Sequence, residues 1–185
     1  SGINGIFSFH STILSVGIPL WIVIVGLNPA LAGIMFTLNT IIAVLFQVAV
    51  TKKAKTFEGG VKSLIIGGIT LIISCIAFSV SIFESKIIAI FLITIGIVFL
   101  TIAEMFQSAG GWTISYDLSP ENNRAEYLSL FNMGTSIQSV IGPAIVTTFV
   151  ITKGIKGWIG CIIVLVVCLF LLKPSIKKYT ERKVN

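Results

Sequence analysis

Long apolar stretches make up most of the chain, and short polar segments separate them. The stretches run at roughly 3–25, 30–51, 62–83, 87–114, 127–151 and 155–173, and a polar tail follows at 174–185. A helix needs about 20 apolar residues to cross the hydrocarbon of a bilayer, and each stretch is close to that length. The stretches are twice as long as barrel strands and do not alternate between apolar and polar positions. The pattern therefore predicts an all-α membrane protein with six transmembrane helices.

Lysine and arginine are distributed unevenly between the two ends of these helices. One end carries ten, namely Lys52, Lys53, Lys55, Lys62, Arg124 and the five basic residues from Lys173 onward, and the other carries three, Lys86, Lys153 and Lys156. Cytoplasmic loops hold the excess of basic residues in membrane proteins. We therefore predict a multi-pass protein of the cell (plasma) membrane with both termini in the cytoplasm.

Composition narrows the possible partners and chemistry. Hydrophobic residues make up 55% of the chain and charged residues 11%, against roughly a quarter charged in a soluble domain. This excess of apolar surface predicts the lipid bilayer as a partner and leaves no room for a separate soluble domain. The net charge of +6 lies in loops and the tail rather than on one stripe with interleaved aromatic residues, so we expect no nucleic-acid partner.

The motifs of common enzymes are missing from the sequence. It has no Walker-type phosphate loop, no HExxH pair and no serine nucleophile followed by a histidine. Its three cysteines, Cys75, Cys161 and Cys168, lie inside apolar stretches without disulfide or zinc spacing, so we interpret them as packing residues. We therefore expect no catalytic activity, cofactor or metal. Because the chain begins with Ser1, without Met, a basic segment or a cleavage site, we interpret it as entered in mid-course.

Glu104 is the only carboxylate within an apolar stretch. A charge at this depth costs a few kcal/mol, so such residues usually face a bundle interior or an aqueous cavity. Gln107, Ser108 and Gly111 follow Glu104 at helical spacing and form one polar stripe with it. Our hypothesis is that Glu104 binds a proton or a cationic substrate, with Gln107 beside it. The alternative is a glutamate that reaches the cytoplasmic interface or has a structural partner.

Further polar residues lie at membrane depth and are candidates for the same site. They are His10 in the first stretch, Asn39 in the second, and Asn132, Ser136 and Gln138 in the fifth. Asn132, Ser136 and Ser139 share one helical face, which is a candidate for a cavity lining. The histidine could relay protons, and the amides and the hydroxyl could contact a substrate. For each of them, a hydrogen bond to a neighbouring helix is the structural alternative.

Two further features concern the shape of the helices. Gly142-Pro143 interrupts the fifth stretch and predicts a kink, because proline removes a helical hydrogen bond and its ring clashes with the preceding turn. Trp21, Trp112 and Trp158 lie near the ends of stretches, which predicts that they belong to the aromatic belts at the membrane surface.

Several of these segments resemble one family. Thr101–Ala109, Asp117-Leu118-Ser119-Pro120, Arg124-Ala125-Glu126-Tyr127 and Gly142-Pro143 look like the tenth and eleventh helices of major facilitator superfamily (MFS) transporters, and are similar to the drug:proton antiporters among them. Pro19-Leu20-Trp21, Asn28-Pro29 and Asn39 resemble the seventh and eighth helices. The chain is therefore identified as similar to the C-terminal six-helix half, residues 1–185, of a twelve-helix transporter.

The resemblance implies a function and a mechanism. Two six-helix bundles would rock about a site between them, and protonation of a carboxylate would drive efflux of small amphipathic compounds or drugs. An N-terminal half, on the same chain or as a partner, would complete the site. By this resemblance, Asp117, Pro120 and Arg124 would belong to the cytoplasmic loop motif of the family. Two alternatives are the membrane subunit of an ABC-type permease and a non-transporting six-helix scaffold or immunity protein.

Overall fold

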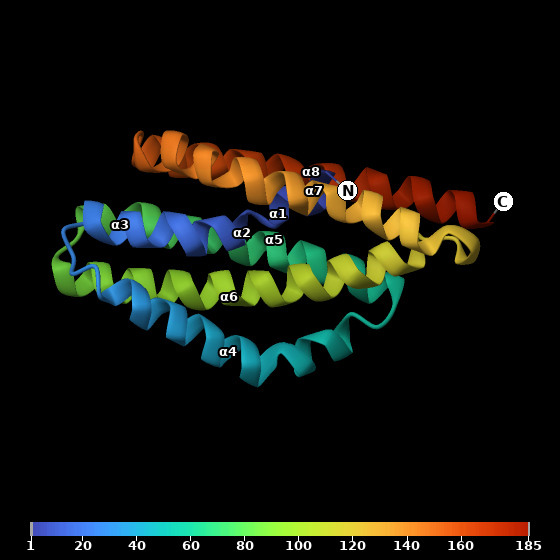
Figure 1. Ribbon diagram of the computed structural model, residues 1–185, viewed down its shortest axis with the longest axis horizontal. Coiled ribbons are helices and arrows are strands. Elements are labelled where there is room, and N and C mark those ends of the chain that lie inside the picture. Colours follow the sequence, from blue (N-terminus) through green and yellow to red (C-terminus); the bar gives the residue numbers. More distant parts are fainter. Residues whose placement is uncertain (1, 185) are drawn as a thin grey trace.

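Long helical segments run back and forth along one axis (Figure 1). The structure is a computed structural model that describes the backbone of residues 2–184 and the side chains of residues 2–172. The elements are α1 (Gly2–Phe7), α2 (Phe9–Thr12), the π-helical η1 (Ile13–Gly17), α3 (Ile18–Ile24), α4 (Leu31–Lys53), α5 (Phe57–Val80), the 3₁₀ turn η2 (Ser81–Phe83), α6 (Lys86–Asp117), the 3₁₀ turn η3 (Glu121–Asn123), α7 (Arg124–Ile145), the π-helical η4 (Val146–Ile151) and α8 (Ile155–Val184). Residues 2–184 contain no β-strand.

Six of the helical segments are long and apolar enough to cross a membrane. These spans, numbered first to sixth, are Gly2–Ile24, Leu31–Lys53, Phe57–Phe83, Lys86–Asp117, Glu121–Ile151 and Ile155–Leu172. The prediction of an all-α membrane protein with six transmembrane helices is confirmed.

Several helices extend beyond the apolar stretches that predicted them. Helix α6 has 32 residues and is therefore about 48 Å long, whereas the hydrocarbon of a bilayer is about 30 Å thick. The helix continues past its predicted apolar stretch, 87–114, to Asp117. The third helix begins five residues before residue 62, because the hydroxyl of Thr56 accepts a hydrogen bond from the amide of Gly59 (3.1 Å) and caps it. Glu58 adds a negative charge to its first turn. The apolar stretches predict which residues lie within the bilayer, whereas capping and other local interactions determine where each helix begins and ends.

The turns between spans lie at the two ends of the bundle. The turns after α3, η2 and η4 lie at one end, and those after α4 and α6 at the other (Figure 1). Gly26, with φ of 76°, occupies the left-handed region in the first turn, and the amide of Ala30 donates to Asn28 Oδ1 at 2.9 Å. Lys86, Lys153 and Lys156 therefore belong to one end, and Lys52, Lys53 and Arg124 to the other. Which end faces the cytoplasm stays a prediction.

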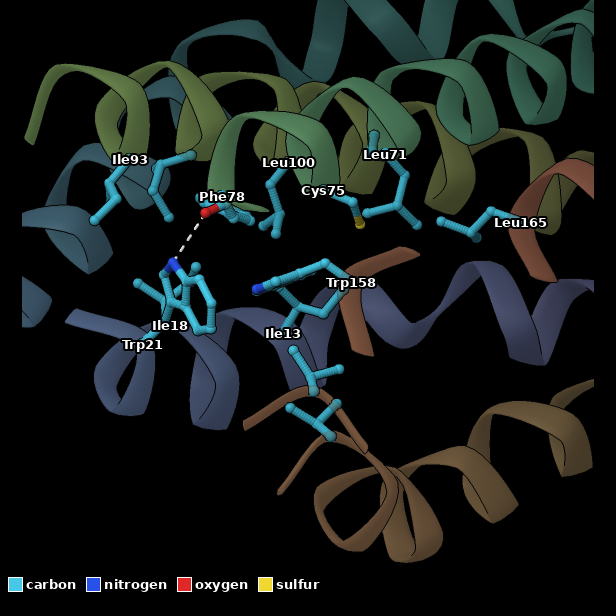
Figure 2. Close-up of a cluster of buried hydrophobic side chains, with 14 of the residues drawn as sticks. Ile13, Ile18, Trp21, Leu71, Cys75, Phe78, Ile93, Leu100, Trp158 and Leu165 are labelled. Atoms are coloured by element: carbon cyan, nitrogen blue, oxygen red, sulfur yellow. Dashed lines mark hydrogen bonds between the residues drawn. The ribbon is translucent and has the colours of Figure 1, made fainter. Parts of the chain in front are cut away.

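An aromatic cluster forms part of the hydrophobic core where the first, third and sixth spans meet (Figure 2). Trp21 and Trp158 are fully buried and pack edge to face, with ring centroids 5.5 Å apart. Phe78 lies 5.4 Å from Trp158. The indole nitrogen of Trp21 donates to the Phe78 carbonyl and to Ser81 Oγ, both at 3.0 Å.

The placement of Trp21 and Trp158 in aromatic belts was therefore wrong. Both residues lie near span ends, as belt residues do, but their rings face the neighbouring spans rather than the headgroups. Trp112, by contrast, is 63% exposed.

The polar tail predicted at 174–185 is helical as far as Val184, because α8 continues past the sixth span. The side chains from Lys173 onward, including the five basic residues counted above, lie outside the described residues.

Candidate functional site

A polar cavity of about 380 Å³ lies between the first, fourth and fifth spans. Amides, hydroxyls, one imidazole and one carboxylate dominate its walls. The lining residues are Asn4, Ser8, His10, Ser11, Glu104, Gln107, Ser108, Gly111, Trp112, Ser115, Phe131, Asn132, Thr135, Gln138 and Ser139. We call this set the polar cavity. So many hydrogen-bonding groups at membrane depth are costly unless they face one another, water or a polar ligand.

Helix α6 supplies one wall through its periodicity. Glu104, Gln107, Ser108 and Ser115 recur at three-, four- or seven-residue spacing and all line the cavity. The stripe predicted on this helix is therefore present as one face, and Glu104 and Gln107 lie in it as expected.

An amide network joins the first and fourth spans at the cavity. Gln107 Nε2 donates to Asn4 Oδ1 at 2.8 Å and to Ser8 Oγ at 3.1 Å. The Ser8 hydroxyl in turn donates to the Asn4 carbonyl at 2.9 Å. All three side chains are at least nine-tenths buried, so each bond replaces contacts that lipid could not supply.

Glu104 is held from the second span. Asn39 Nδ2 donates to Glu104 Oε2 at 3.0 Å and to the Thr101 hydroxyl at 2.9 Å. The Thr101 hydroxyl donates its hydrogen bond to the Ile97 carbonyl at 2.8 Å, so its oxygen can accept the bond from Asn39. Asn39 is therefore a support behind the cavity wall rather than part of its lining. One carboxylate oxygen is fixed, and the residue still lines the polar cavity.

His10 has a defined orientation in the part of the wall that the first span forms. Its Nδ1 lies 2.9 Å from the Phe7 carbonyl, which can only accept a hydrogen bond. In the neutral ring Nδ1 therefore carries the hydrogen and Nε2 is left as an acceptor. His10 and Glu104, the two titratable residues among those that line the cavity, come from different spans. Among the described residues, no group of three or more His, Cys, Asp or Glu side chains could hold a metal ion.

Gln138 links the fifth span to the first. Its Nε2 donates to the Thr12 hydroxyl at 2.5 Å. Gly142, one turn further along α7, allows this contact, because a Cβ there would lie 2.7 Å from both Gln138 Nε2 and Thr12 Oγ1. The glycine of the predicted Gly142-Pro143 kink is thus needed for a close approach between helices.

The remaining α7 candidates separate into two groups. Asn132 lines the cavity together with Thr135, Gln138 and Ser139. Ser136 does not line it: its side chain is exposed, and its hydroxyl lies 3.3 Å from the Asn132 carbonyl of the same helix. The shared face expected for Asn132, Ser136 and Ser139 therefore holds for the first and last of them.

Several cavity residues were not predicted. Asn4 is central to the amide network, and Thr135 lies between two candidates. The spacing of Asn4, Ser8, Ser11 and Ser15 would have indicated a polar face in the first span, because three or four residues separate successive members. Trp112 also lines the cavity, and its position four residues after Ser108 and eight after Glu104 would have indicated this.

The predicted kink coincides with a change of helix type. Helix α7 contains Pro143 and ends at Ile145, and the π-helical η4 follows it directly. The first span has a π-helical segment too, η1. The two segments lie in contact: a Cβ on Gly17 would lie 3.3 Å from Val146 Cγ1.

The loop motif beyond α6 is organised around an arginine. Asp117 ends α6, Pro120 precedes the 3₁₀ turn, and Arg124 begins α7. Arg124 Nη1 donates to the Tyr116 hydroxyl at 3.0 Å, and its guanidinium lies 4.1 Å from the Tyr116 ring centroid. This cation–π contact fixes the end of α6 to the start of α7.

Comparison with known proteins identifies the family. A family model described as Major Facilitator Superfamily matches residues 1–184. No curated protein and no solved structure matches the chain. The match covers the whole polar cavity and the loop motif.

Proposed function

The chain belongs to the Major Facilitator Superfamily of multi-pass membrane transporters, and from this premise we propose that it is a proton-coupled secondary transporter that exports small amphipathic compounds or drugs. Glu104 carries the proposal: it is a carboxylate at membrane depth that lines a polar cavity and is held on one side by Asn39. The family match argues against the ABC-type permease and scaffold alternatives.

A proton at Glu104 would change the interactions of the cavity. An ionised carboxylate attracts a cationic substrate and only accepts hydrogen bonds, whereas the protonated group is neutral and can donate one. Substrate and proton would then compete for the same site. His10, which also lines the cavity, offers Nε2 as a second proton-binding atom. If protonated and ionised Glu104 favour different conformations of the transporter, binding of a proton or of substrate shifts the equilibrium between those conformations.

The cavity lining supports an amphipathic substrate. Amides such as Asn132 and Gln138 can bond polar groups, while Trp112 and Phe131 offer aromatic surface to apolar or cationic groups.

The exposed polar residues support a second six-helix bundle as partner. Ser11, Ser15, Asn132, Ser136 and Ser139 are exposed on the first and fifth spans at membrane depth. Lipid would not solvate their polar groups well, so a covering protein or an aqueous space is expected there. We propose that an N-terminal half, on the same chain or as a separate partner, covers this face in the plasma membrane, with the Lys52 and Arg124 end in the cytoplasm.

The decisive experiment compares two carboxylate variants of the full native chain in liposomes. With an imposed proton gradient and a fluorescent cationic dye as probe, wild type should move the dye. Glu104→Gln should reduce this movement at least tenfold, because the amide cannot bind and release a proton. Glu84→Gln, in an exposed turn, is the matched control and should behave as wild type. If Glu104→Gln kept the gradient-driven rate, the proposed role of Glu104 would be wrong.

The mass of the native protein tests whether an N-terminal six-helix half accompanies this chain. Its intact mass, read with the coding sequence upstream of Ser1, should reveal about six further helices on the same chain or a separate six-helix subunit that co-purifies. A protein that transports in liposomes with neither would contradict the proposal.

A further inference from the structure

A second cavity, of about 340 Å³, is apolar and separate from the polar cavity. It lies between the first, third, fifth and sixth spans and shares no lining residue with the polar cavity. Its floor is core: Ile13, Leu71 and Leu165 are each at most 3% exposed. Its rim is open, because Phe149 and Val164 are about half exposed, at 51% and 49%. We call this cavity, with all the residues that line it, the apolar groove.

The groove lies at membrane depth. All of its lining residues belong to the six spans, and its rim residues come from η4 and α8, which run side by side (Figure 1). An unfilled apolar space loses the dispersion contacts of its walls, and apolar cavities do not hold ordered water because water needs polar partners. A flexible hydrocarbon chain therefore fits this space better than water does.

One end of the groove carries positive charge. The Nζ atom of Lys153 lies 4.9 Å from the centroid of the Phe149 ring, which forms the rim. Lys156 directly precedes Gly157, which also lines the groove. Both lysines are exposed, and among the described residues neither has an ion-pair partner. An apolar groove that ends at two cations matches a ligand with a hydrocarbon chain and an anionic head.

We propose that the apolar groove is a binding site for an anionic phospholipid. One acyl chain lies over Ile13, Leu71 and Leu165 between the fifth and sixth spans. The phosphate lies at the membrane surface opposite the Lys52 and Arg124 end, beside Lys153 and Lys156, because these two cations attract an anionic headgroup. The inference does not depend on the proposed transport function, because the groove and the polar cavity have separate linings.

Lipid retention by the full native chain tests this site. The protein is reconstituted in equal amounts of phosphatidylglycerol and phosphatidylcholine, extracted in mild detergent and analysed by native mass spectrometry. Wild type should retain phosphatidylglycerol in several-fold preference. The double variant Lys153→Ala/Lys156→Ala should lose that preference. Lys153→Ala alone should weaken it, whereas Lys86→Ala, at the same end of the bundle, should leave it unchanged.

A groove-filling variant tests the acyl-chain position separately. Val164→Trp places a large ring on the rim and should reduce the retained lipid of either headgroup several-fold. Val167→Trp is the matched control, because Val167 is 50% exposed on the same helix but does not line the groove.

Three results would overturn the proposal. The first is equal retention of the two lipids by wild type, and the second is unchanged retention in Val164→Trp. The third is a change in oligomeric mass with Val164→Trp while retained lipid stays constant, which would make the groove a protein contact. Dye transport, measured in the same preparations, reports on the polar cavity independently.

Discussion

The polar cavity and the aromatic cluster both lie where spans of the bundle meet, yet different forces hold them. In the cluster, Trp21, Phe78 and Trp158 pack without space between their rings, and only the Trp21 indole makes hydrogen bonds. In the cavity wall, the side chains of Asn4, Gln107 and Gln138 hold spans together by direct hydrogen bonds beside an open space.

This difference separates rigidity from adaptability. Tight packing in a cluster has few alternative arrangements, because moving one ring leaves a void or a clash. A hydrogen bond beside a cavity can be exchanged for one to water or to a ligand at little cost. We therefore expect substitutions in the cluster to change stability and substitutions in the cavity to change transport.

The largest stability effect should come from Trp21→Ala. It removes a fully buried ring and two hydrogen bonds. We expect the free energy of unfolding to fall by about 3 kcal/mol, the lower end of the range for soluble cores. The lower end applies because moving an apolar ring from lipid into the bundle gains little hydrophobic free energy. Thermal unfolding in detergent measures the change. The control, Trp112→Ala, removes an exposed ring from the cavity wall and should alter stability by less than about 0.5 kcal/mol. Similar melting temperatures for the two variants would remove the distinction between the regions.

Gly142→Ala should have the next largest effect. Its Cβ would lie 2.7 Å from Gln138 Nε2 and Thr12 Oγ1. Either these side chains move and their hydrogen bond is lost, or the first and fifth spans separate, at a cost of about 1–3 kcal/mol. Gly160→Ala is the control, because a Cβ there meets nothing within 4 Å and should be neutral or stabilise by up to about 1 kcal/mol through helix propensity. Unfolding of both variants under identical conditions checks the prediction, and a stable Gly142→Ala protein would contradict it.

Gln107→Leu sharpens the comparison from the cavity side. The leucine keeps the size of the side chain but leaves Asn4 Oδ1 without this donor. We expect a stability loss of about 1 kcal/mol and a larger effect on dye transport, about tenfold. The readout is the ratio of transport rate to folded protein. A loss of stability with a normal rate per folded molecule would show that Gln107 is purely structural.

The smallest effect should be that of Trp158→Phe. Among the described residues, the Trp158 indole nitrogen has no hydrogen-bond partner, and in Figure 2 it lies on the edge of the ring nearest Trp21. Phenylalanine keeps an aromatic contact there, so we expect a cost of less than about 1 kcal/mol. Trp21→Phe loses the donor to Phe78 and Ser81 and should cost about 1–2 kcal/mol more. Equal melting temperatures would mean that these hydrogen bonds add nothing.

Features that depend on period or length could be predicted from the sequence. The six spans follow from apolar length, and Glu104 and Gln107 share a wall because a helix keeps its three- and four-residue neighbours on one face. Contacts between spans could not be predicted in this way. Asn39 was a candidate on its own helix, but its bond to Glu104 depends on how the second and fourth spans pack.

Two errors have the same cause. Trp158 was placed at the membrane surface and Ser136 on the cavity face because each was interpreted from its own helix alone. The neighbouring spans bury Trp158. Ser136 lies outside the cavity lining, and its hydroxyl contacts a carbonyl of its own helix. The spacing of residues in the sequence predicts which side chains share a face of one helix. Which face is buried depends on how the spans pack against one another.

The π-helical segment η4 has a geometric consequence for the fifth span. A π turn contains more residues than the 3.6 of an α turn, so each residue advances the helix through less than 100°. Side chains from Val146 onward therefore point in directions rotated about the helix axis from those that a continuous α-helix would give them. Gln138 and Ser139 line the polar cavity, whereas Ile145, the last residue of α7, and Phe149, within η4, line the apolar groove. A single span thus lines two chemically different cavities in sequence. The wide turn falls within the second of them, where it shifts the direction of the Phe149 side chain relative to that of Ile145.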